Sequence, residues 1–240
     1  MMMMRWPTLK VLLIALLNLS FTCERQEKKP PEEVTQGAVV PTLQHAEPIF
    51  DNEYVKAVRF TLGPGDKLPP HEGDPRAIYS LSDYKIKWME GDRQTEKEWK
   101  KGQVHWHDAA QHAVENIGNT KAEYLVVARK DVVLPLLEGD EISHAISQLD
   151  VAYSSVVFDN EDVRVMEVKI PNGEKQPMHS GGHRLIYALT AYDAKYRSDK
   201  MGTKESTVKA GTAHWHGPDK HAVENTGQTS ANFLVFEFKK

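Results

Sequence analysis

Two segments of the chain repeat the same arrangement of three histidines. The first runs from Val104 to Thr120 and reads VHWHDAAQHAVENIGNT, and the second runs from Ala213 to Thr229 and reads AHWHGPDKHAVENTGQT. Imidazole nitrogens bind metal ions and exchange protons near neutral pH, so such a cluster is a candidate metal site or acid–base site. Clustered histidines also occur as surface residues, and the elements that carry them decide between these uses.

The first two histidines of each segment predict a strand with both imidazoles on one face. His105 and His107 are separated by one residue, as are His214 and His216. Alternate residues of a strand point to the same side, about 7 Å apart. If that side is the interior, the imidazoles are available as ligands.

The repetition covers most of the chain. Segments that begin at Phe50 and Phe158 align with an offset of 108 residues, which becomes 109 after one inserted residue. A period of about 100 residues suits a duplicated domain and is too long for a solenoid unit. The sequence therefore predicts two homologous domains, 38–135 and 151–240. The linker between them, 136–150, has a short helix as one option.

Both domains are expected to consist of short strands. Segments 54–62 and 162–170 alternate apolar and polar residues, and Gly- and Pro-containing turn signals follow them at 63–65 and 171–173. No long amphipathic helix interrupts this pattern. Many short strands separated by turns predict an all-β sandwich or barrel.

From Phe50 onward the chain resembles the cupin superfamily, whose domains are small jelly-roll barrels. The segment PGDKLPPHEGDPRAIYSL, followed about thirty residues later by KKGQVHWHDAAQHAVENIGNT, is similar to the two cupin motifs, and the second half repeats both. Gly65 and His71 fit the start of the first motif, and His112 and Asn116 fit the end of the second. In the second half the same positions are held by Gly173, His179, His221 and Asn225. The resemblance implies an all-β bicupin: two tandem jelly-roll barrels after an N-terminal signal segment.

Two of the four metal ligands that the resemblance implies are absent from both halves. Gly73 and Gly181 stand where cupins usually have the second histidine of the first motif, and Arg76 and Arg184 stand near the usual glutamate. Two histidines alone hold a metal poorly, because stable sites generally need three or four protein ligands.

The inward-facing histidines can replace the missing ligands. The predicted metal site in each domain then consists of His71, His105, His107 and His112, and of His179, His214, His216 and His221. Zn, Fe, Mn, Ni and Cu all suit imidazole ligands, so the sequence does not choose among them. The alternative is that Val104 and Trp106 fill the core instead, which leaves a metal-free polar cavity.

Four further residues are candidates for substrate binding. Arg76 and Arg184 offer planar guanidinium groups that bind carboxylates in a bidentate manner, or they pair with acidic neighbours on the rim. Tyr79 and Tyr187 lie on the strand after the first motif. They are candidate acid–base groups, with core packing as the alternative.

The N-terminus predicts export. Arg5 and Lys10 precede an apolar run too short to span a bilayer, and Cys23 follows directly. Residues 1–23 resemble a lipoprotein signal peptide with Cys23 as the lipidated residue, and 24–37 read as a charged tether. The protein is then a periplasmic or outer-membrane lipoprotein. Plain secretion and an uncleaved start remain alternatives, because the residues before Cys23 depart from the usual lipobox.

Charge and composition limit the partners. The formal net charge is -4 and no basic run tracks a phosphate backbone, so nucleic acid is not an expected partner. We expect a small-molecule ligand, contact with a membrane only through the lipid anchor, and a monomer or a homodimer. Two function classes stay open: a metal-dependent oxygenase, isomerase or lyase acting on a small polar metabolite, and a binding protein that captures a small acid or sugar without turnover.

Overall fold

The computed structural model describes residues 45–136 and 151–239. The predicted signal segment, lipidation at Cys23, the tether and the linker helix lie outside these residues. The outer boundaries of the two predicted domains also lie there and stay predictions.

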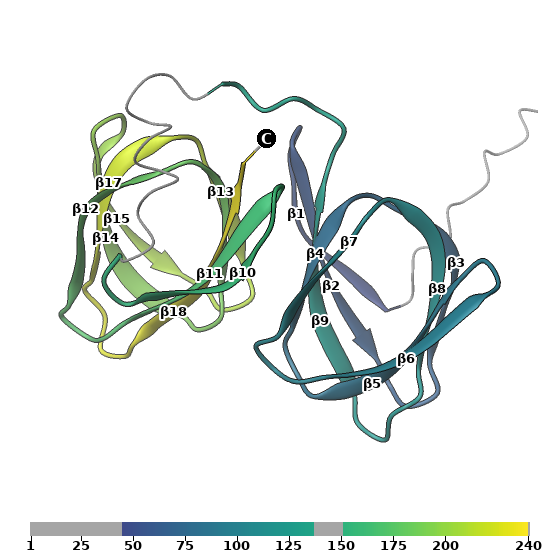
Figure 1. Ribbon diagram of the computed structural model, residues 1–240. Helices are drawn as coiled ribbons and strands as arrows, with labels where there is room; N and C mark the ends of the chain where they lie inside the picture. The colour runs from purple at the N-terminus through teal and green to yellow at the C-terminus, as the bar shows by residue number, and fades with distance from the viewer. Residues whose placement is uncertain (1–44, 137–150, 240) are drawn as a thin grey trace, which may run out of the picture. The chain divides into compact units, whose positions relative to one another are not determined.

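The first half folds into nine strands that form barrel 1, drawn in blue to teal in Figure 1. They are β1 (Ala46–Asp51), β2 (Val55–Leu62), β3 (Lys67–Gly73), β4 (Arg76–Ser80), β5 (Tyr84–Glu90), β6 (Arg93–Trp99), β7 (Val104–His107), β8 (Ala110–Asn116) and β9 (Ala122–Arg129).

The second half repeats the arrangement as barrel 2, drawn in green to yellow. Its strands are β10 (Ser154–Asp159), β11 (Val163–Ile170), β12 (Lys175–Gly181), β13 (His183–Ala188), β14 (Tyr192–Ser198), β15 (Gly202–Val208), β16 (Ala213–His216), β17 (Asp219–Asn225) and β18 (Ala231–Phe238).

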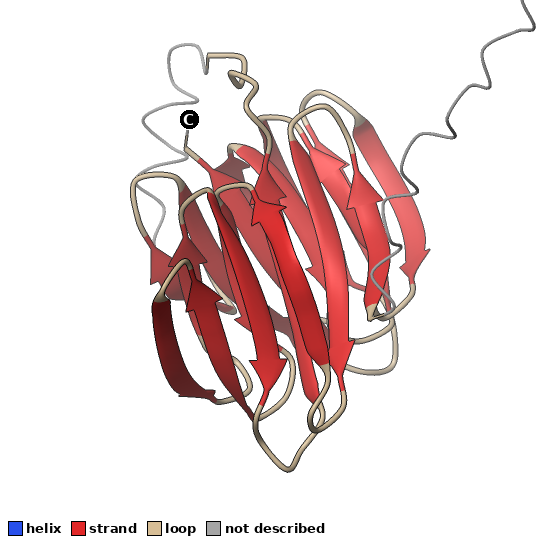
Figure 2. Cartoon of the chain, turned by 90° about the vertical axis from the view of Figure 1, so that its right-hand side faces the viewer, coloured by secondary structure: helices blue, strands red, loops and turns tan. Residues whose placement is uncertain are grey.

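Each barrel is made of a five-stranded and a four-stranded antiparallel sheet. Barrel 1 has the strand orders β1-β2-β9-β4-β7 and β3-β8-β5-β6, and barrel 2 has β10-β11-β18-β13-β16 and β12-β17-β14-β15. Figure 2 shows only strands and loops in the described part of the chain. The predicted all-β class with two tandem jelly rolls is therefore confirmed. Within 45–136 and 151–239 no helix is long and apolar enough to cross a membrane.

The strand register brings the candidate residues of barrel 1 together. In the β3–β8 ladder His71 lies opposite His112, and in the β4–β7 ladder Arg76 lies opposite His107. The first of these ladders contains a register shift between Leu68 and His71. Barrel 2 has the corresponding pairs His179–His221 and Arg184–His216.

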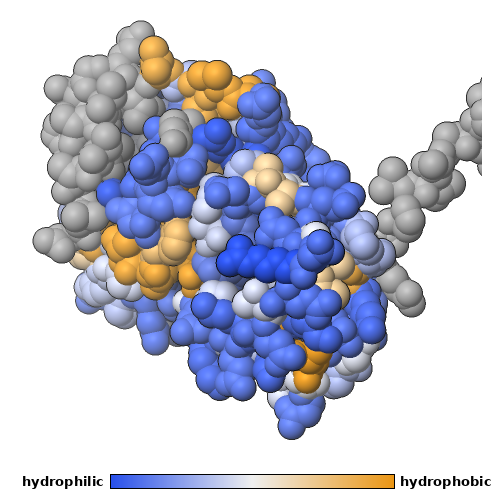
Figure 3. Space-filling view, turned by 45° about the vertical axis from the view of Figure 1, so that its right-hand side comes forward, coloured by the Kyte–Doolittle hydropathy of each residue, from blue (hydrophilic) through white to orange (hydrophobic). Residues whose placement is uncertain are grey.

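The cores explain why this register is held. Inside barrel 1, Phe60, Leu68 and Ile86 belong to one buried apolar cluster, and Val168 and Phe233 belong to its counterpart in barrel 2. A third cluster contains the residues on the opposite face of both five-stranded sheets. A one-residue slip would exchange the two faces of a strand, so these clusters fix the pairing. The face shown in Figure 3 is mainly hydrophilic, with apolar patches between the polar residues.

Candidate functional site

The histidine pair on β7 faces the interior of barrel 1. His105 is 9% exposed, and its ring stacks on Trp99 with 3.8 Å between centroids. His107 stacks on Trp88 at 4.2 Å. The intervening Trp106 packs against the apolar cluster on the other face of the sheet. Strand alternation therefore turns the histidines inward, which is one of the two orientations that the sequence left open, and in barrel 2 His214 and His216 line the interior cavity in the same way.

The two histidines that fit the cupin motifs meet in each barrel. The ring centroids of His71 and His112 are 4.2 Å apart, as are those of His179 and His221. The Nδ1 of His71 donates to the carbonyl of Pro69 at 2.8 Å. This hydrogen bond fixes the ring and leaves Nε2 as the acceptor.

A buried arginine lies against this pair in barrel 1. Arg76 is 3% exposed, and its Nη1 donates to the carbonyls of Asp74 at 2.7 Å and Asp108 at 3.3 Å. Its Nη2 lies 3.2 Å from Nδ1 and 3.3 Å from Nε2 of His112, against the ring.

The glycine before each arginine makes room for the guanidinium. A Cβ atom at Gly73 would lie 2.4 Å from Nη1 of Arg76 and 2.8 Å from Cε1 of His112. At Gly181 it would lie 2.7 Å from Nη1 of Arg184. The two departures from the cupin pattern are therefore linked. The arginine side chain occupies the space beside the glycine, so the second histidine of the motif could not stand at that position.

The arginine of barrel 2 has the same cradle and additional partners. Nη1 of Arg184 donates to the carbonyls of Gly182 at 2.9 Å and Gly217 at 3.1 Å. Nη2 donates to Oδ1 of Asp219 at 2.8 Å and to the hydroxyl of Tyr196 at 2.9 Å. A buried ion pair thus closes the centre of this barrel.

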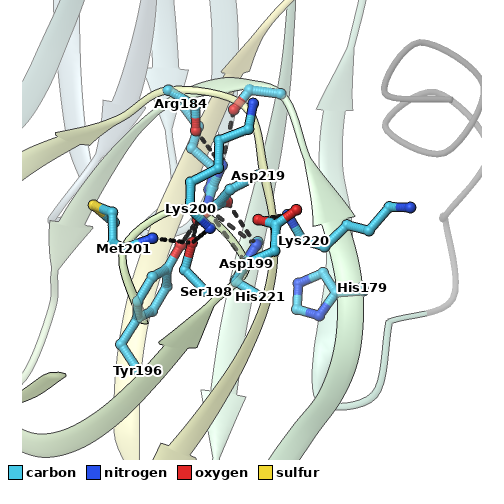
Figure 4. Close-up of polar contacts among 12 residues, drawn as sticks. His179, Arg184, Tyr196, Ser198, Asp199, Lys200, Met201, Asp219, Lys220 and His221 are labelled. Carbon is cyan, nitrogen blue, oxygen red and sulfur yellow. Dashed lines mark hydrogen bonds and ion pairs between the residues drawn. The ribbon is translucent and has the colours of Figure 1, made fainter. Parts of the chain in front are cut away.

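Asp219 is the hub of that centre (Figure 4). Its Oδ2 accepts hydrogen bonds from the hydroxyls of Tyr196 and Ser198, both at 2.6 Å, and its Oδ1 lies 3.1 Å from Nδ1 of His221. Burial alone would raise the pKa of Asp219, but these hydrogen bonds and the charge of Arg184 outweigh it and hold the pKa far below its usual range. The carboxylate is therefore ionised at any physiological pH.

Four interior histidines have strongly lowered pKa values and are neutral at pH 7. Burial, reinforced by neighbouring positive charge, lowers the pKa of His105 to about 3 and that of His107 to about 4. Burial is also the main cause that lowers the pKa of His112 to about 4 and that of His216 to about 3. An imidazolium would have to share the interior with a permanent guanidinium, which explains the direction of these pKa shifts.

The two barrels enclose different cavities. The cavity of barrel 2 has a volume of about 480 Å³ and is lined by Tyr196, His214, His216 and Val208, among others. The cavity of barrel 1 measures about 330 Å³ and is bounded by Trp88 and Trp99. Trp99 lies opposite Tyr84 in its sheet just as Val208 lies opposite Tyr192 in the other. An indole therefore lines the smaller cavity where an isopropyl group lines the larger one.

Comparison with known proteins supports the fold. No family model matches the sequence, and no curated protein matches it. Solved structures do match: AerE from Microcystis aeruginosa has a TM-score of 0.56 at 16% identity, covering 82% of this chain and 98% of its own. The oxalate decarboxylase of Lactobacillus farciminis, solved as a formate complex, has a TM-score of 0.58 at 12% identity, with 82% and 85% covered. A variant of Bacillus subtilis oxalate decarboxylase has a TM-score of 0.58 at 12% identity, with 81% and 75% covered.

This chain has the bicupin fold. The identities are low, so the likeness concerns the fold, and the activity of this bicupin has to be argued from its own residues.

The interior of the barrels shows no preformed metal centre among the described residues. Residues 45–136 and 151–239 contain no group of three or more His, Cys, Asp or Glu side chains arranged to hold a metal ion. The guanidinium of Arg76 lies in contact with His112, one of the predicted ligands. Two unit charges 4 Å apart repel by about 4 kcal/mol at an effective dielectric constant of 20, and a divalent ion would meet about twice that. The predicted metal site stays a prediction, and this geometry favours the metal-free alternative.

The structure favours core packing for the two candidate tyrosines, which line neither of the two cavities described above. Their role in substrate binding stays a prediction. Tyr79 and Tyr187 belong to the apolar cluster on the opposite face of the five-stranded sheets. Arg76 faces inward, and Tyr79 is three residues further along the same strand, so alternation turns its side chain outward. Burial raises the pKa of Tyr79 to about 12, as expected for a packing residue.

The sequence interpretation missed the polar partners of Arg184. Asp219, Tyr196 and Ser198 were not singled out, although an offset of 109 pairs Asp219 with Ala110. A carboxylate two residues before His221 in one half, with alanine in the other, was the available signal. Strand pairing confirms the correspondence, because Asp219 lies opposite Gly181 and Ala110 lies opposite Gly73.

Proposed function

We propose that this bicupin binds a small molecule inside its barrels without a metal ion. The observation that carries the proposal is the buried guanidinium that contacts the motif histidine in both barrels, Arg76 on His112 and Arg184 on His221. A permanent cation there replaces the positive charge that a metal ion would supply, and it leaves no coordination position between the histidines. The protein then acts as a binding module.

The cavity of barrel 2 is the main candidate for the ligand site. Its volume of about 480 Å³ lies in the range of small-molecule pockets, which is roughly 300 to 1,000 Å³. Ile186 and Phe233 supply apolar walls, and Lys204 supplies a positive charge. Nδ1 of His216 is buried and has no hydrogen-bond partner among the described residues. An unpaired buried polar atom costs free energy, so a ligand that pairs with it gains affinity.

A fluorescent probe tests this proposal. We expect 8-anilinonaphthalene-1-sulfonate to bind the purified full chain with the same affinity before and after treatment with EDTA. Val208→Trp places an indole in the cavity, as Trp99 does in barrel 1, and should weaken probe binding at least tenfold. Val156→Trp makes the same change on an exposed position of β10 and serves as the control. Loss of binding in EDTA, or equal binding by both variants, would overturn the proposal.

Export remains a proposal that rests on the N-terminal sequence. We propose that Cys23 anchors the protein to a membrane through a lipid, with the tether placing the barrels outside the cytoplasm. Metabolic labelling with a palmitate analogue should mark the wild-type chain and not Cys23→Ser. An unlabelled wild-type chain recovered in the soluble fraction outside the cytoplasm would instead support plain secretion.

A further inference from the structure

The two buried arginines differ in what surrounds one nitrogen atom. Nη1 has the same two kinds of carbonyl partner in both barrels, so each guanidinium is held in the same position. Nη2 of Arg184 has a carboxylate and a hydroxyl as acceptors. Among the described residues, the polar partner of Nη2 in Arg76 is the His112 ring alone.

Barrel 1 lacks both buried carboxylates that face the arginine of barrel 2. Asp219 corresponds to Ala110 by strand pairing. Glu237 lies opposite Arg184 in the β13–β18 ladder, and the residue opposite Arg76 in the β4–β9 ladder is Ala128. No ion pair of Arg76 with a carboxylate occurs among the described residues.

A donor beside Arg76, the indole N–H of Trp88, has no hydrogen-bond partner among the described residues. Trp88 takes the position of Tyr196 in the β5–β8 ladder, where it lies opposite Val114 as Tyr196 lies opposite Val223. Its ring lies 5.4 Å from Cζ of Arg76. The Nε1 atom of Trp88 is buried and makes no hydrogen bond to the described residues. Buried donors of this kind are normally satisfied, so the unpaired Trp88 N–H beside a guanidinium without a carboxylate indicates a missing acceptor.

We propose that barrel 1 binds the carboxylate group of a small organic acid at Arg76, in the position that the Asp219 carboxylate occupies in barrel 2. This inference rests on the proposed metal-free binding function and names its ligand class. In barrel 2 the carboxylate belongs to the Asp219 side chain, and in barrel 1 the proposed ligand supplies it. Arginine is suited to this role, because its planar fork matches the geometry of a carboxylate.

The site of the proposed carboxylate lies at the partly exposed residue Ala110, whereas Asp219 is only 5% exposed. Two exposed carboxylates, Asp74 and Glu90, act on Arg76 through space and oppose an incoming anion. Glu90 holds the place of Ser198 in barrel 2. We therefore expect Glu90→Gln to tighten carboxylate binding.

The test is a titration of the ¹⁵N-labelled full chain with sodium acetate at pH 7, followed by NMR. Sodium chloride at equal ionic strength is the reference anion. Saturable shifts are expected for the Arg76 guanidinium and the Trp88 indole N–H, with no response from Arg184. Shifts that chloride reproduces, or that do not saturate, would overturn the proposal.

Matched variants locate the site. Ala110→Asp supplies the carboxylate internally and should weaken acetate binding at least tenfold. Gln111→Asp adds the same charge at an exposed position one residue away and should leave the binding unchanged. Asp219→Ala should make Arg184 responsive to acetate. If that variant does not fold, the comparison of Ala110→Asp with Gln111→Asp still decides, because equal binding by these two would refute the site.

Repeating the titration in EDTA separates this inference from the proposed function. Acetate binding that requires a metal ion would refute the metal-free function. Absence of acetate binding, with probe binding in barrel 2 intact, would refute the carboxylate site alone.

Discussion

Barrel 1 and barrel 2 hold the same guanidinium in the same cradle of carbonyls and differ in the charge that faces it. In barrel 2 the charge of Arg184 is balanced by Asp219, which three further side chains hold in place. In barrel 1 the corresponding residue is Ala110, and Trp88 stacks on His112 with 4.1 Å between ring centroids. The guanidinium of barrel 2 has a buried carboxylate in contact, and among the described residues that of barrel 1 has none.

The difference shows how a duplicated domain can divide two tasks. A buried charge that lacks an opposite charge in contact costs free energy, so we expect Arg76 to stabilise the fold less than Arg184 does. The proposed carboxylate ligand would pair with Arg76 and so explain why an arginine stands at this position. Barrel 2, whose cation is already paired, has the larger cavity and can select ligands by shape and by the polar groups on its wall.

Acid should produce the largest effect and should reveal the difference between the barrels. The pKa values of the buried histidines lie below the value of about 6.5 expected in the unfolded chain, so the unfolded chain binds more protons between pH 6.5 and 4. The free energy of unfolding is therefore highest above pH 6.5, where these histidines are neutral in both states, and it decreases as the pH falls toward 4. Each such histidine contributes up to about 3 kcal/mol over this range.

Both barrels should respond to acid, because burial lowers the pKa of His179 to about 4 and that of His216 to about 3 as well. The barrels differ at one pair of positions: the Asp219 carboxylate opposes the lowering of the pKa of His221, and His112 has no such neighbour. Urea unfolding followed by tryptophan fluorescence at pH 7 and pH 4.5 measures the change. His105→Phe keeps the stacking on Trp99 and removes one titrating group, so it should reduce the pH dependence. A free energy of unfolding that is equal at the two pH values would contradict the buried, neutral state of these histidines.

Asp219→Ala should cost about 3 to 5 kcal/mol of unfolding free energy, because it leaves Arg184 buried without its partner. Sodium acetate should restore part of this loss. Asp193→Ala removes an exposed carboxylate of β14 and should change stability by less than about 0.5 kcal/mol. Chemical denaturation measures the free energy of unfolding of both variants. Equal losses would mean that the buried ion pair stabilises the protein no more than an exposed carboxylate does.

Trp99→Val should make barrel 1 resemble barrel 2. The change removes the stacking on His105 and leaves space, for an expected loss of about 2 kcal/mol. It should also create a second binding site for the anilinonaphthalene probe. A fluorescence titration that still shows one site would indicate that Trp99 does not limit the cavity of barrel 1.

Ala110→Asp should have the smallest effect, a gain of about 1 kcal/mol. A carboxylate beside Arg76 forms a charge-assisted hydrogen bond, and part of that gain is offset by desolvation. Thermal unfolding compares the variant with Gln111→Asp, for which we expect no gain. Destabilisation by Ala110→Asp would show that the space beside Arg76 differs from the one that Asp219 fills.

The sequence predicted the fold because its signals are local and occur twice. Strand alternation, the turns around Gly65 and Gly173, and the 108-residue offset together indicate two all-β domains, and alternation also turned His105 inward as observed. Gly65 and Gly173 have φ angles of +82° and +77°, which glycine adopts without strain.

The site was predicted less well because its chemistry depends on long-range placement. The sequence assigned Arg76 to a carboxylate or to the rim, and its contact with His112 arises only when β4 and β8 face each other across the barrel. The contact with Asp219 that distinguishes Arg184 is equally non-local. For Tyr79 the sequence left acid–base chemistry and core packing both open, because the sequence alone does not show which face of that strand meets the cavity.

The central claim is that a guanidinium stands in place of a metal ion in both barrels. Elemental mass spectrometry of the full chain tests it most directly, after incubation with Zn, Fe, Mn, Ni or Cu salts and removal of unbound metal. Gly73→His combined with Arg76→Glu restores the usual ligand types and is the positive control. We predict less than about 0.1 equivalent of any metal in the wild type and clear uptake by the double variant. Near-stoichiometric metal in the wild type that falls by half in His112→Ala and in His221→Ala would contradict the account.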